Sequence, residues 1–258
     1  MKIDYEATVD FVFSFVETFS RQDVGWILAG YRNLPSHEPS RAALARLQRM
    51  GVVLDDGRGP KAKMRLAPEA RQRLLVTRPQ ESWSKPWAGK WRVVTYDLPL
   101  PQRKDRYALW DALRANKFGL LQQSVWLWPH DLEPILQEIV LQTGLPECFC
   151  GFEAGRLFLC DDRELVSAAW DFEEIGRRHQ TYVKHLVATP TAAKSVSDLK
   201  ALGRLLRIES DAYQYAFTLD PLLPRELCPR GYKGFAVEER HCQFRAAIGG
   251  RLRQLASA

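Results

Sequence analysis

A proline- and tryptophan-rich segment at residues 77–90, with the sequence TRPQESWSKPWAGK, constrains the fold more than any other feature of the sequence. Pro79 and Pro86 each lack a backbone N–H and disfavour helical geometry in the residue before them, so no single helix can run through the segment. Helical patterns precede the segment and strand patterns follow it. The sequence therefore predicts a linker at residues 79–90 that ends an N-terminal domain at residues 1–78.

Three helices are predicted in the N-terminal domain, at residues 8–19, at residues 22–31 and after Ser36, whose hydroxyl suits a helix N-cap. Their order is typical of a helix-turn-helix. In the third helix, the helical period places apolar and small residues on one side. These residues are Ser40, Ala43, Leu44, Leu47 and Met50.

The opposite face of this third helix carries small residues surrounded by arginines. Ala42, Ala45 and Arg49 share this face, and Arg41 and Arg46 flank it. A surface helix has no packing reason to prefer alanine there. A helix in the major groove of DNA gains from small residues, because they let arginine side chains reach guanine edges and phosphates. The pattern predicts a DNA recognition helix, against the alternative of a merely solvated surface.

A β-hairpin is predicted directly after the third helix. Residues 52–54 and 61–66 have strand patterns, and a glycine-rich turn at residues 55–60 joins them. Such a hairpin is the wing of a winged helix, and Arg58, Lys61 and Lys63 would contact phosphates beside the groove. Residues 41–78 contain ten Lys or Arg against three acids, while the whole chain has a net charge of +6. The positive charge therefore belongs to this domain and favours an anionic partner.

After the linker, the sequence predicts a small domain at residues 91–161 and a helical domain at residues 162–258. The expected order in the small domain is β-α-β-α-β-β, which is close to a ferredoxin-like sandwich. Its elements are expected at residues 91–97, 103–115, 119–128, 131–142, 147–152 and 156–160. Helices are expected at residues 164–187, 197–219 and 235–255. The predicted fold class is α+β, with a winged helix-turn-helix, a ferredoxin-like middle domain and helices at the C-terminus.

Five groups of residues, in order along nearly the whole chain, resemble the PaaX family of bacterial transcriptional repressors. They are SHEPSRAALARLQRMG at residues 36–51, WAGKW at residues 87–91, Tyr96-Asp97-Leu98-Pro99 with Arg103 and Arg106, the stretch from Lys117-Phe118-Gly119 through Ser124-Val125-Trp126 to Pro129, and Trp170-Asp171 with DPLLPREL at residues 220–227. The sequence departs from the family pattern at two positions. Pro39 lies early in the recognition helix, and Tyr232 stands where the family pattern leads us to expect a tryptophan.

The resemblance implies a winged-helix repressor of a catabolic operon. It also implies a middle domain that forms homodimers and is similar to a small CRISPR-adaptation nuclease. In the family, an aryl-acetyl-CoA thioester releases the repressor from its operator, so the resemblance implies a small-molecule effector of acyl-CoA type. A dimer would bind an inverted repeat in double-stranded DNA. The residues that would bind the effector are unknown at this point.

The remaining patterns argue against catalysis, a cofactor and a membrane. The five cysteines are odd in number, few for the length of the chain and form no C-x-x-C pair, so neither a disulfide framework nor a zinc site is indicated and a cytoplasmic protein is expected. No metal-ligand spacing, nucleophile motif or glycine-rich nucleotide loop is present, and no apolar run reaches the roughly 20 residues of a membrane span. We therefore expect no catalytic residue, no metal and no cofactor. Two alternatives stay open: a metal-dependent nuclease that uses Asp97 at a strand end, and a protein-interaction scaffold that has lost DNA binding.

Overall fold

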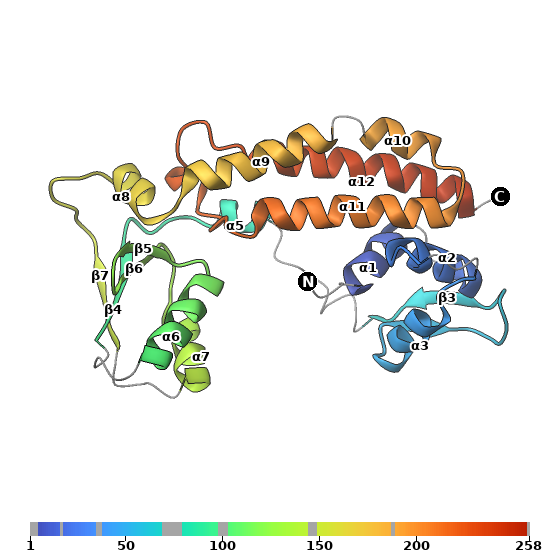
Figure 1. Cartoon of the computed structure of the whole chain (residues 1–258), viewed down its shortest axis with the longest axis horizontal. Coiled ribbons are helices and arrows are strands. Elements are labelled where there is room, and N and C mark those ends of the chain that lie inside the picture. Colours follow the sequence, from blue (N-terminus) through green and yellow to red (C-terminus); the bar gives the residue numbers. More distant parts are fainter. Residues whose placement is uncertain are drawn as a thin grey trace. The chain divides into compact units, whose positions relative to one another are not determined.

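The computed structural model describes residues 5–15, 18–34, 38–68, 79–97, 103–143, 149–186 and 189–256. In these residues the chain is a mixed α+β protein with helices and two antiparallel sheets (Figure 1). The chain divides into two compact units. Unit 1 comprises residues 1–78, 180–215 and 235–258, and unit 2 comprises residues 79–179 and 216–234. The helices after residue 162 thus contribute to both units, and the expected succession of separate domains stays a prediction.

The N-terminal part of unit 1 combines helices with a small antiparallel sheet. The helices are α1 (Tyr5–Phe15), α2 (Arg21–Tyr31) and α3 (Arg41–Arg49). The strands are β1 (Phe19–Ser20), β2 (Val53–Asp55) and β3 (Lys63–Leu66), in the order β1-β3-β2. Val53 pairs with Leu66, and Phe19 pairs with Met64. The predicted hairpin is therefore present, and β1 extends it into a three-stranded sheet.

The first predicted helix, at residues 8–19, is wrong at its C-terminal end. Helix α1 ends at Phe15, and Phe19 enters strand β1, where its side chain is buried. Ser20 then caps α2, because its Oγ accepts a hydrogen bond of 3.1 Å from the backbone N–H of Asp23. The hydrophobic pattern predicts only two residues between the first and second helices. The cap of α2 and the strand pairing of Phe19 separate them further.

Helix α3 begins at Arg41 and not directly after Ser36, which lies outside the described residues. Pro39 explains the later start, because a proline disfavours helical geometry in the residue before it. Pro39 is therefore not inside the helix. The backbone N–H of Ser40 donates instead to the carbonyl of Gly25 in α2, at 2.9 Å. Ser40 is the N-cap residue, although its hydroxyl makes no capping bond.

Four further helices lie wholly or partly in unit 1: α9 (Phe172–Leu186), α10 (Thr189–Ser195), α11 (Leu199–Phe217) and α12 (Gly234–Ala256). Helices α2 and α11 approach so closely that side chains are excluded at their crossing. A Cβ on Gly30 would lie 1.9 Å from the carbonyl oxygen of Lys200, and a Cβ on Gly203 would lie 2.0 Å from that of Ile27. Only glycine fits at these two positions, so the crossing depends on both.

Helix α12 packs against α1 in a similar way. A Cβ on Gly249 would lie 2.1 Å from the ring of Phe15, and the guanidinium of Arg245 lies 4.5 Å from the ring centre of Phe11. Unit 1 is thus built from the N-terminal segment together with helices that lie more than 100 residues later in the chain. The N-terminal helices use these later helices to cover part of their apolar surface.

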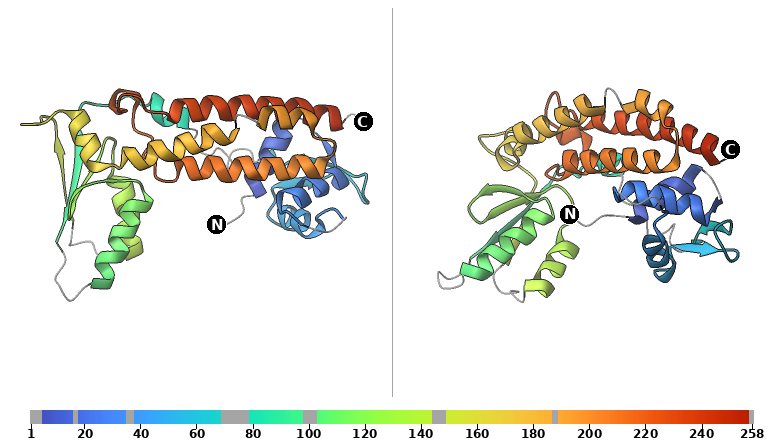
Figure 2. Two further views of the ribbon diagram at one scale, coloured as in Figure 1. Left: turned by 45° about the horizontal axis from the view of Figure 1, so that its top comes forward. Right: turned by 45° about the vertical axis from the view of Figure 1, so that its right-hand side comes forward.

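Unit 2 is centred on a four-stranded antiparallel sheet with the strand order β5-β6-β4-β7. Its elements are β4 (Trp91–Tyr96), α6 (Arg103–Ala115), β5 (Gly119–Gln122), β6 (Val125–Trp128), α7 (Glu133–Thr143) and β7 (Phe149–Ala154). Helices α6 and α7 lie side by side on the sheet (Figure 2). This β-α-β-β-α-β order is that of a ferredoxin-like fold.

The predicted order of elements in this domain was wrong in two places, although the architecture is close. The strand expected at residues 119–128 is a hairpin, with a turn at Gln123 and Ser124 between β5 and β6. The strands expected at residues 147–152 and 156–160 are replaced by the single strand β7, and residues 156–160 form no strand. Residues 144–148 lie outside the described part of the chain.

Both faces of this sheet are covered by apolar side chains. Trp126 and Val94 pack with Leu109 of α6 and Ile139 of α7 on one face. On the other face, the sheet packs against α8 (Asp162–Ala169) and the short 3₁₀ helix η2 (Arg225–Leu227). Trp91 is 1 % exposed and Trp126 is fully buried, so both tryptophans contribute to the packing around the sheet.

Two sequence segments adopt helices that differ from the expected ones. The expected linker contains helix α5 (Pro79–Ser84), whose Trp83 is buried. The helix expected at residues 164–187 is interrupted, because Trp170 is extended and α9 (Phe172–Leu186) starts anew after it. The Asp171 side chain promotes this new start by accepting a hydrogen bond of 2.9 Å from the N–H of Glu174.

Candidate nucleic-acid interface

The eight residues that the sequence predicts as DNA contacts are all exposed and all lie in unit 1. Five belong to α3 and three to the β2–β3 hairpin: Arg41, Ala42, Ala45, Arg46, Arg49, Arg58, Lys61 and Lys63. The opposite side of α3 is buried, through Ala43, Leu44 and Leu47. Met50 was expected on that buried side but is 42 % exposed, because it caps the end of the helix. The predicted division of the helix into two faces is otherwise present.

Most of the cationic groups on this surface are available to an external anion. The side chains of Arg41, Arg46, Arg58, Lys61 and Lys63 form no hydrogen bond or ion pair with any described part of the chain. Arg49 is the exception, since its Nε donates to the carbonyl of Ala45 at 3.3 Å. Unpaired guanidinium and ammonium groups on one surface attract a polyanion and keep their donors available for its oxygens.

The loop between β2 and β3 is fastened to the start of α2. The backbone N–H of Arg21 donates to the carbonyl of Ala62 at 2.8 Å, and that of Gln22 donates to the carbonyl of Pro60 at 3.0 Å. Gly59 has a φ of 98°, a conformation that favours glycine and lets the loop turn. The basic side chains of the loop are therefore carried on a backbone that α2 holds in place.

A groove of about 600 Å³ separates α3 from this loop. Its lining comes from the start of α2, from one side of α3 and from the loop. The lining residues are Arg21, Gln22, Pro39, Arg41, Leu44, Ala45, Gln48, Gly59 and Pro60. The groove thus shares Arg41 and Ala45 with the predicted DNA-binding surface.

Three residues beside the groove form a bridge that sequence analysis missed. Oδ2 of Asp55 lies 2.6 Å from the guanidinium of Arg21 and accepts a hydrogen bond of 3.1 Å from Nε2 of Gln48. Asp55 belongs to the glycine-rich turn in the sequence, and Arg21 precedes the predicted second helix. Neither position has a local pattern that reveals the contact, because the partners are brought together by the pairing of β-strands.

Asp97, the residue of the nuclease alternative, directly follows β4 and is exposed. Asp111 on α6 is also exposed, and the side chain of Asp105 lies outside the described residues. A divalent metal that cleaves phosphodiesters needs several oxygen ligands close together. The described residues contain no group of three or more His, Cys, Asp or Glu side chains that could hold a metal ion.

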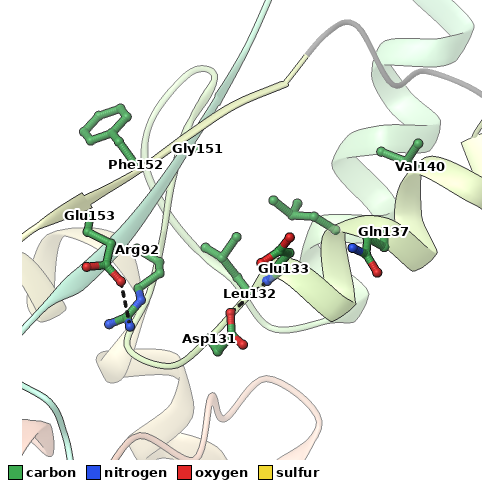
Figure 3. Close-up of a pocket in the computed structure, with 10 residues that line it drawn as sticks. Arg92, Asp131, Leu132, Glu133, Gln137, Val140, Gly151, Phe152 and Glu153 are labelled. Carbon is green, nitrogen blue, oxygen red and sulfur yellow. Dashed lines mark hydrogen bonds and ion pairs between the residues drawn. The ribbon is translucent and has the colours of Figure 1, made fainter.

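A second cavity, of about 420 Å³, lies in unit 2 between α7 and strands β4 and β7 (Figure 3). Leu132, Leu136 and Val140 supply apolar lining from α7 and the residues before it. Asp131, Glu133 and Glu153 line it as well, against a single cation, Arg92, which pairs with Glu153 at 2.9 Å. The excess of acids does not suit an anionic ligand such as a coenzyme A thioester.

The Asp220 carboxylate anchors the segment around residues 220–232 within unit 2. It is fully buried, lies 2.9 Å from Nε2 of His179 and accepts a hydrogen bond of 2.6 Å from the hydroxyl of Tyr232. Burial first, and then the Asp220 charge, raise the pKa of Tyr232 above its usual range. Tyr232, one of the two departures from the family pattern, therefore acts here as a neutral hydrogen-bond donor.

The described helices include none that is long and apolar enough to cross a membrane. Residues 84–166 match the family model described as the PaaX protein central Cas2-like domain. No curated protein matches the chain. Among solved structures, the chain is similar to the uncharacterized protein Rv0674 from Mycobacterium tuberculosis, with 19 % sequence identity and a TM-score of 0.65 over 98 % of this chain and 99 % of that chain. At this identity, the likeness shows a shared fold.

Proposed function

We propose that this chain, whose residues 84–166 match the PaaX protein central Cas2-like domain, is a PaaX-like, sequence-specific DNA-binding regulator of transcription. The observation that carries the proposal is the exposed surface of α3. It presents two alanines among arginines, opposite a buried apolar face. A helix of this kind fits the major groove, because small residues let the arginines approach base edges.

In this proposal, residues 1–78 form a winged helix-turn-helix. Helix α3 is the recognition helix, with Arg41, Arg46 and Arg49 directed at the bases and phosphates of one major groove. The β2–β3 hairpin is the wing, and Arg58, Lys61 and Lys63 contact the adjacent phosphates. The exposure of these side chains and the lack of internal partners for five of the six cations support this assignment.

The regulator is proposed to act as a homodimer and as a repressor. The ferredoxin-like domain at residues 91–161 would join two chains, and each would place one recognition helix on half of an inverted repeat. Residues 162–258 would form the helical C-terminal domain. An acyl-CoA-type effector would release the protein from DNA, as the family resemblance suggests. The cytoplasm is the proposed location, where both DNA and such an effector are found.

A titration of labelled DNA by fluorescence anisotropy tests this function. The DNA comes from upstream of the protein's own gene, an unrelated duplex serves as competitor, and the titration is repeated at two salt concentrations. We expect binding that prefers the upstream DNA and weakens as salt rises, because cations on the protein replace condensed counterions. Light scattering of the complex is expected to show two chains per duplex. Equal binding to both duplexes, or no binding, would contradict the proposal.

Acyl-CoA compounds are then added to the preformed complex. Release of the upstream DNA by one of them, at a concentration that leaves binding to unrelated duplex unchanged, is the result expected of a repressor with such an effector. If no acyl-CoA compound dissociated the complex, the proposed effector would be wrong, and the proposed DNA binding would not be affected.

A further inference from the structure

The groove between α2, α3 and the β2–β3 loop has a chemistry of its own, distinct from that of the exposed face of α3. We propose that it holds one phosphodiester of the DNA backbone, and that Asp55 is the residue that positions Arg21 for this contact. The inference rests on the proposed DNA-binding function and deepens it. It adds Arg21, Gln48 and Asp55 to the functional residues of the chain.

The lining of the groove suits a sugar–phosphate unit. Two arginines, Arg21 and Arg41, line the groove, and guanidinium groups bind phosphate through paired N–H donors. Leu44, Ala45 and Pro60 supply an apolar surface for the deoxyribose. The volume of about 600 Å³ lies within the roughly 300–1,000 Å³ usual for ligand sites.

The charge of the groove favours an anion even though an aspartate stands beside it. Asp55 is the acid that contacts the lining, and its Oδ2 already binds Arg21 at 2.6 Å and Gln48 at 3.1 Å. Its side chain is 13 % exposed, whereas that of Arg21 is 36 % exposed. The carboxylate is therefore turned inward and the guanidinium outward. Arg21 has five N–H donors, so the contact with Asp55 leaves others for a phosphate.

Asp55 links strand β2, to which it belongs, with helices α2 and α3 through its side-chain contacts. It ends β2, Arg21 begins α2, and Gln48 lies near the end of α3. Its other oxygen, Oδ1, is buried and has no hydrogen-bond partner in the described part of the chain. A buried carboxylate oxygen without a partner lowers the stability of the fold. The two contacts that Oδ2 makes with Arg21 and Gln48 must offset this loss. We assign to Asp55 the role of fixing the Arg21 side chain at the edge of the groove.

The position of the groove agrees with a backbone contact. It lies between the recognition helix and the wing, and Arg41 and Ala45 belong both to its lining and to the predicted DNA-binding surface. A DNA strand that borders the major groove passes between these two elements in the proposed complex. The occupant is therefore the DNA backbone rather than a free anion.

Two substitutions separate a positioning role from simple charge effects. Arg21→Gln removes one phosphate contact, so we expect the affinity for every duplex to fall roughly tenfold and the slope of log affinity against log salt to decrease by about one, with sequence preference unchanged. Asp55→Asn removes a negative charge from the interface. Electrostatics alone would make this variant bind more tightly. If Asp55 positions Arg21, the variant binds more weakly despite its gained charge.

The experiment measures anisotropy with the full chain and the upstream duplex. Neutral methylphosphonate groups replace single backbone phosphates in turn, which probes the contact without altering the protein. We expect several substitutions to weaken wild-type binding, because Arg58, Lys61 and Lys63 are also proposed to contact phosphates. One position in each half-site, that of the groove, is expected to have no further effect on Arg21→Gln. Arg177→Gln, an exposed arginine of α9 in unit 2, is the matched control and leaves binding unchanged. Thermal melts confirm that each variant is folded.

The outcomes distinguish this inference from the proposed function. Wild-type protein that prefers its upstream DNA would overturn the groove assignment and leave the function standing if Arg21→Gln bound as tightly as the wild type and lost affinity at every methylphosphonate position that weakens the wild type. Tighter binding by Asp55→Asn would overturn the positioning role. A wild type without any DNA binding would overturn both the function and the groove. Inhibition of wild-type binding by millimolar inorganic phosphate, with no methylphosphonate position that loses its effect in Arg21→Gln, would identify a free-anion site and contradict the backbone contact.

Discussion

Arg46 and Lys61 represent two kinds of contact on the proposed DNA-binding surface. Arg46 lies on α3, where a guanidinium can form two hydrogen bonds to one guanine, whereas Lys61 lies in the β2–β3 loop. We expect Arg46→Ala to lower the affinity for the upstream DNA by about 1–3 kcal/mol and to relax specificity at one base pair. We expect Lys61→Ala to weaken binding to all duplexes alike.

Competition titrations with duplexes that carry single base-pair changes measure both effects. The two variants serve as controls for each other, because each removes one exposed cation. If Arg46→Ala weakened binding equally for every duplex, Arg46 would be a backbone contact and not a base contact. If neither variant changed binding, the proposed surface would be wrong.

Glu174 provides a prediction that does not depend on the function. Its carboxylate accepts hydrogen bonds of 2.7 Å from Arg177 and from Arg178, and these hold its pKa at about 2. The folded pKa is thus lower than the unfolded one. The resulting stabilisation is present above the unfolded pKa, which lies near 4.5, and is lost as the pH falls toward 2.

An NMR titration of the Glu174 carboxyl group tests this prediction. We expect a midpoint near 2 in the intact chain, and a higher midpoint in Arg178→Ala, which loses one of the two partners. Glu173→Gln, the neighbouring exposed acid, is the control and leaves the midpoint unchanged. A wild-type midpoint above 4 would show that the ion pairs do not persist in solution, where salt screens exposed charges.

At the scale of elements, the α2–α11 crossing is the most demanding contact of unit 1. An alanine at position 203 would place its Cβ 2.0 Å from the carbonyl oxygen of Ile27, so the helices would have to separate. We expect Gly203→Ala to destabilise the chain by about 1–3 kcal/mol, the usual cost of overpacking. Gly250→Ala is the matched control, because its Cβ would meet nothing within 4 Å.

Urea unfolding of the two variants provides the comparison. Gly250 lies inside α12, so its replacement by alanine is expected to stabilise the protein by about 0.5–1 kcal/mol through helix propensity. A Gly203→Ala variant as stable as the wild type would show that α2 and α11 do not cross as closely as described.

The elements with strong local signals were predicted well from the sequence. The helix expected at residues 103–115 matches α6, and the hairpin after α3 was found because a glycine-rich turn separates two alternating strands. The division of α3 into an apolar and a basic face likewise followed from the helical period alone. Such signals are encoded within about ten residues and need no knowledge of the tertiary structure.

The elements that were missed depend on partners distant in sequence. Strand β1 has only two residues and exists because it pairs with β3. The turn between β5 and β6 has the sequence Gln-Ser and lacks glycine, asparagine or proline, so nothing local interrupts the strand pattern. The groove was missed for the same reason, since Arg21, Gln48 and Asp55 meet only after the sheet of unit 1 has formed.

At the scale of the whole molecule, unit 1 is assembled from three separate stretches of chain. Helices α1 and α2 are held by α11 and α12 through glycine contacts and through a hydrogen bond from the Tyr31 hydroxyl to Ser210. A fragment of residues 1–78 would lose all of these contacts. We therefore expect it to melt at a lower temperature than the full chain and with less cooperativity.

Circular dichroism melts and amide hydrogen exchange compare the fragment with the intact protein. Fast exchange in α2 of the fragment, together with slow exchange in α2 of the full chain, is the expected result. Equal protection in both would show that residues 1–78 form an independent domain, as the sequence predicted. The same fragment also tests whether α3 binds DNA without the later helices.

The glycine contacts between early and late helices also affect the order in which the chain folds during translation. A ribosome releases a chain from its N-terminus at about 5–20 residues per second, so α1 and α2 emerge well before α12. Until α12 has been made, Phe11 and Phe15 lack the helix that contacts them. The scaffold that carries the basic surface is therefore finished only after α12 has been made. In the proposed function, a nascent or prematurely terminated chain that lacks α12 would therefore present its recognition helix on an incompletely packed scaffold.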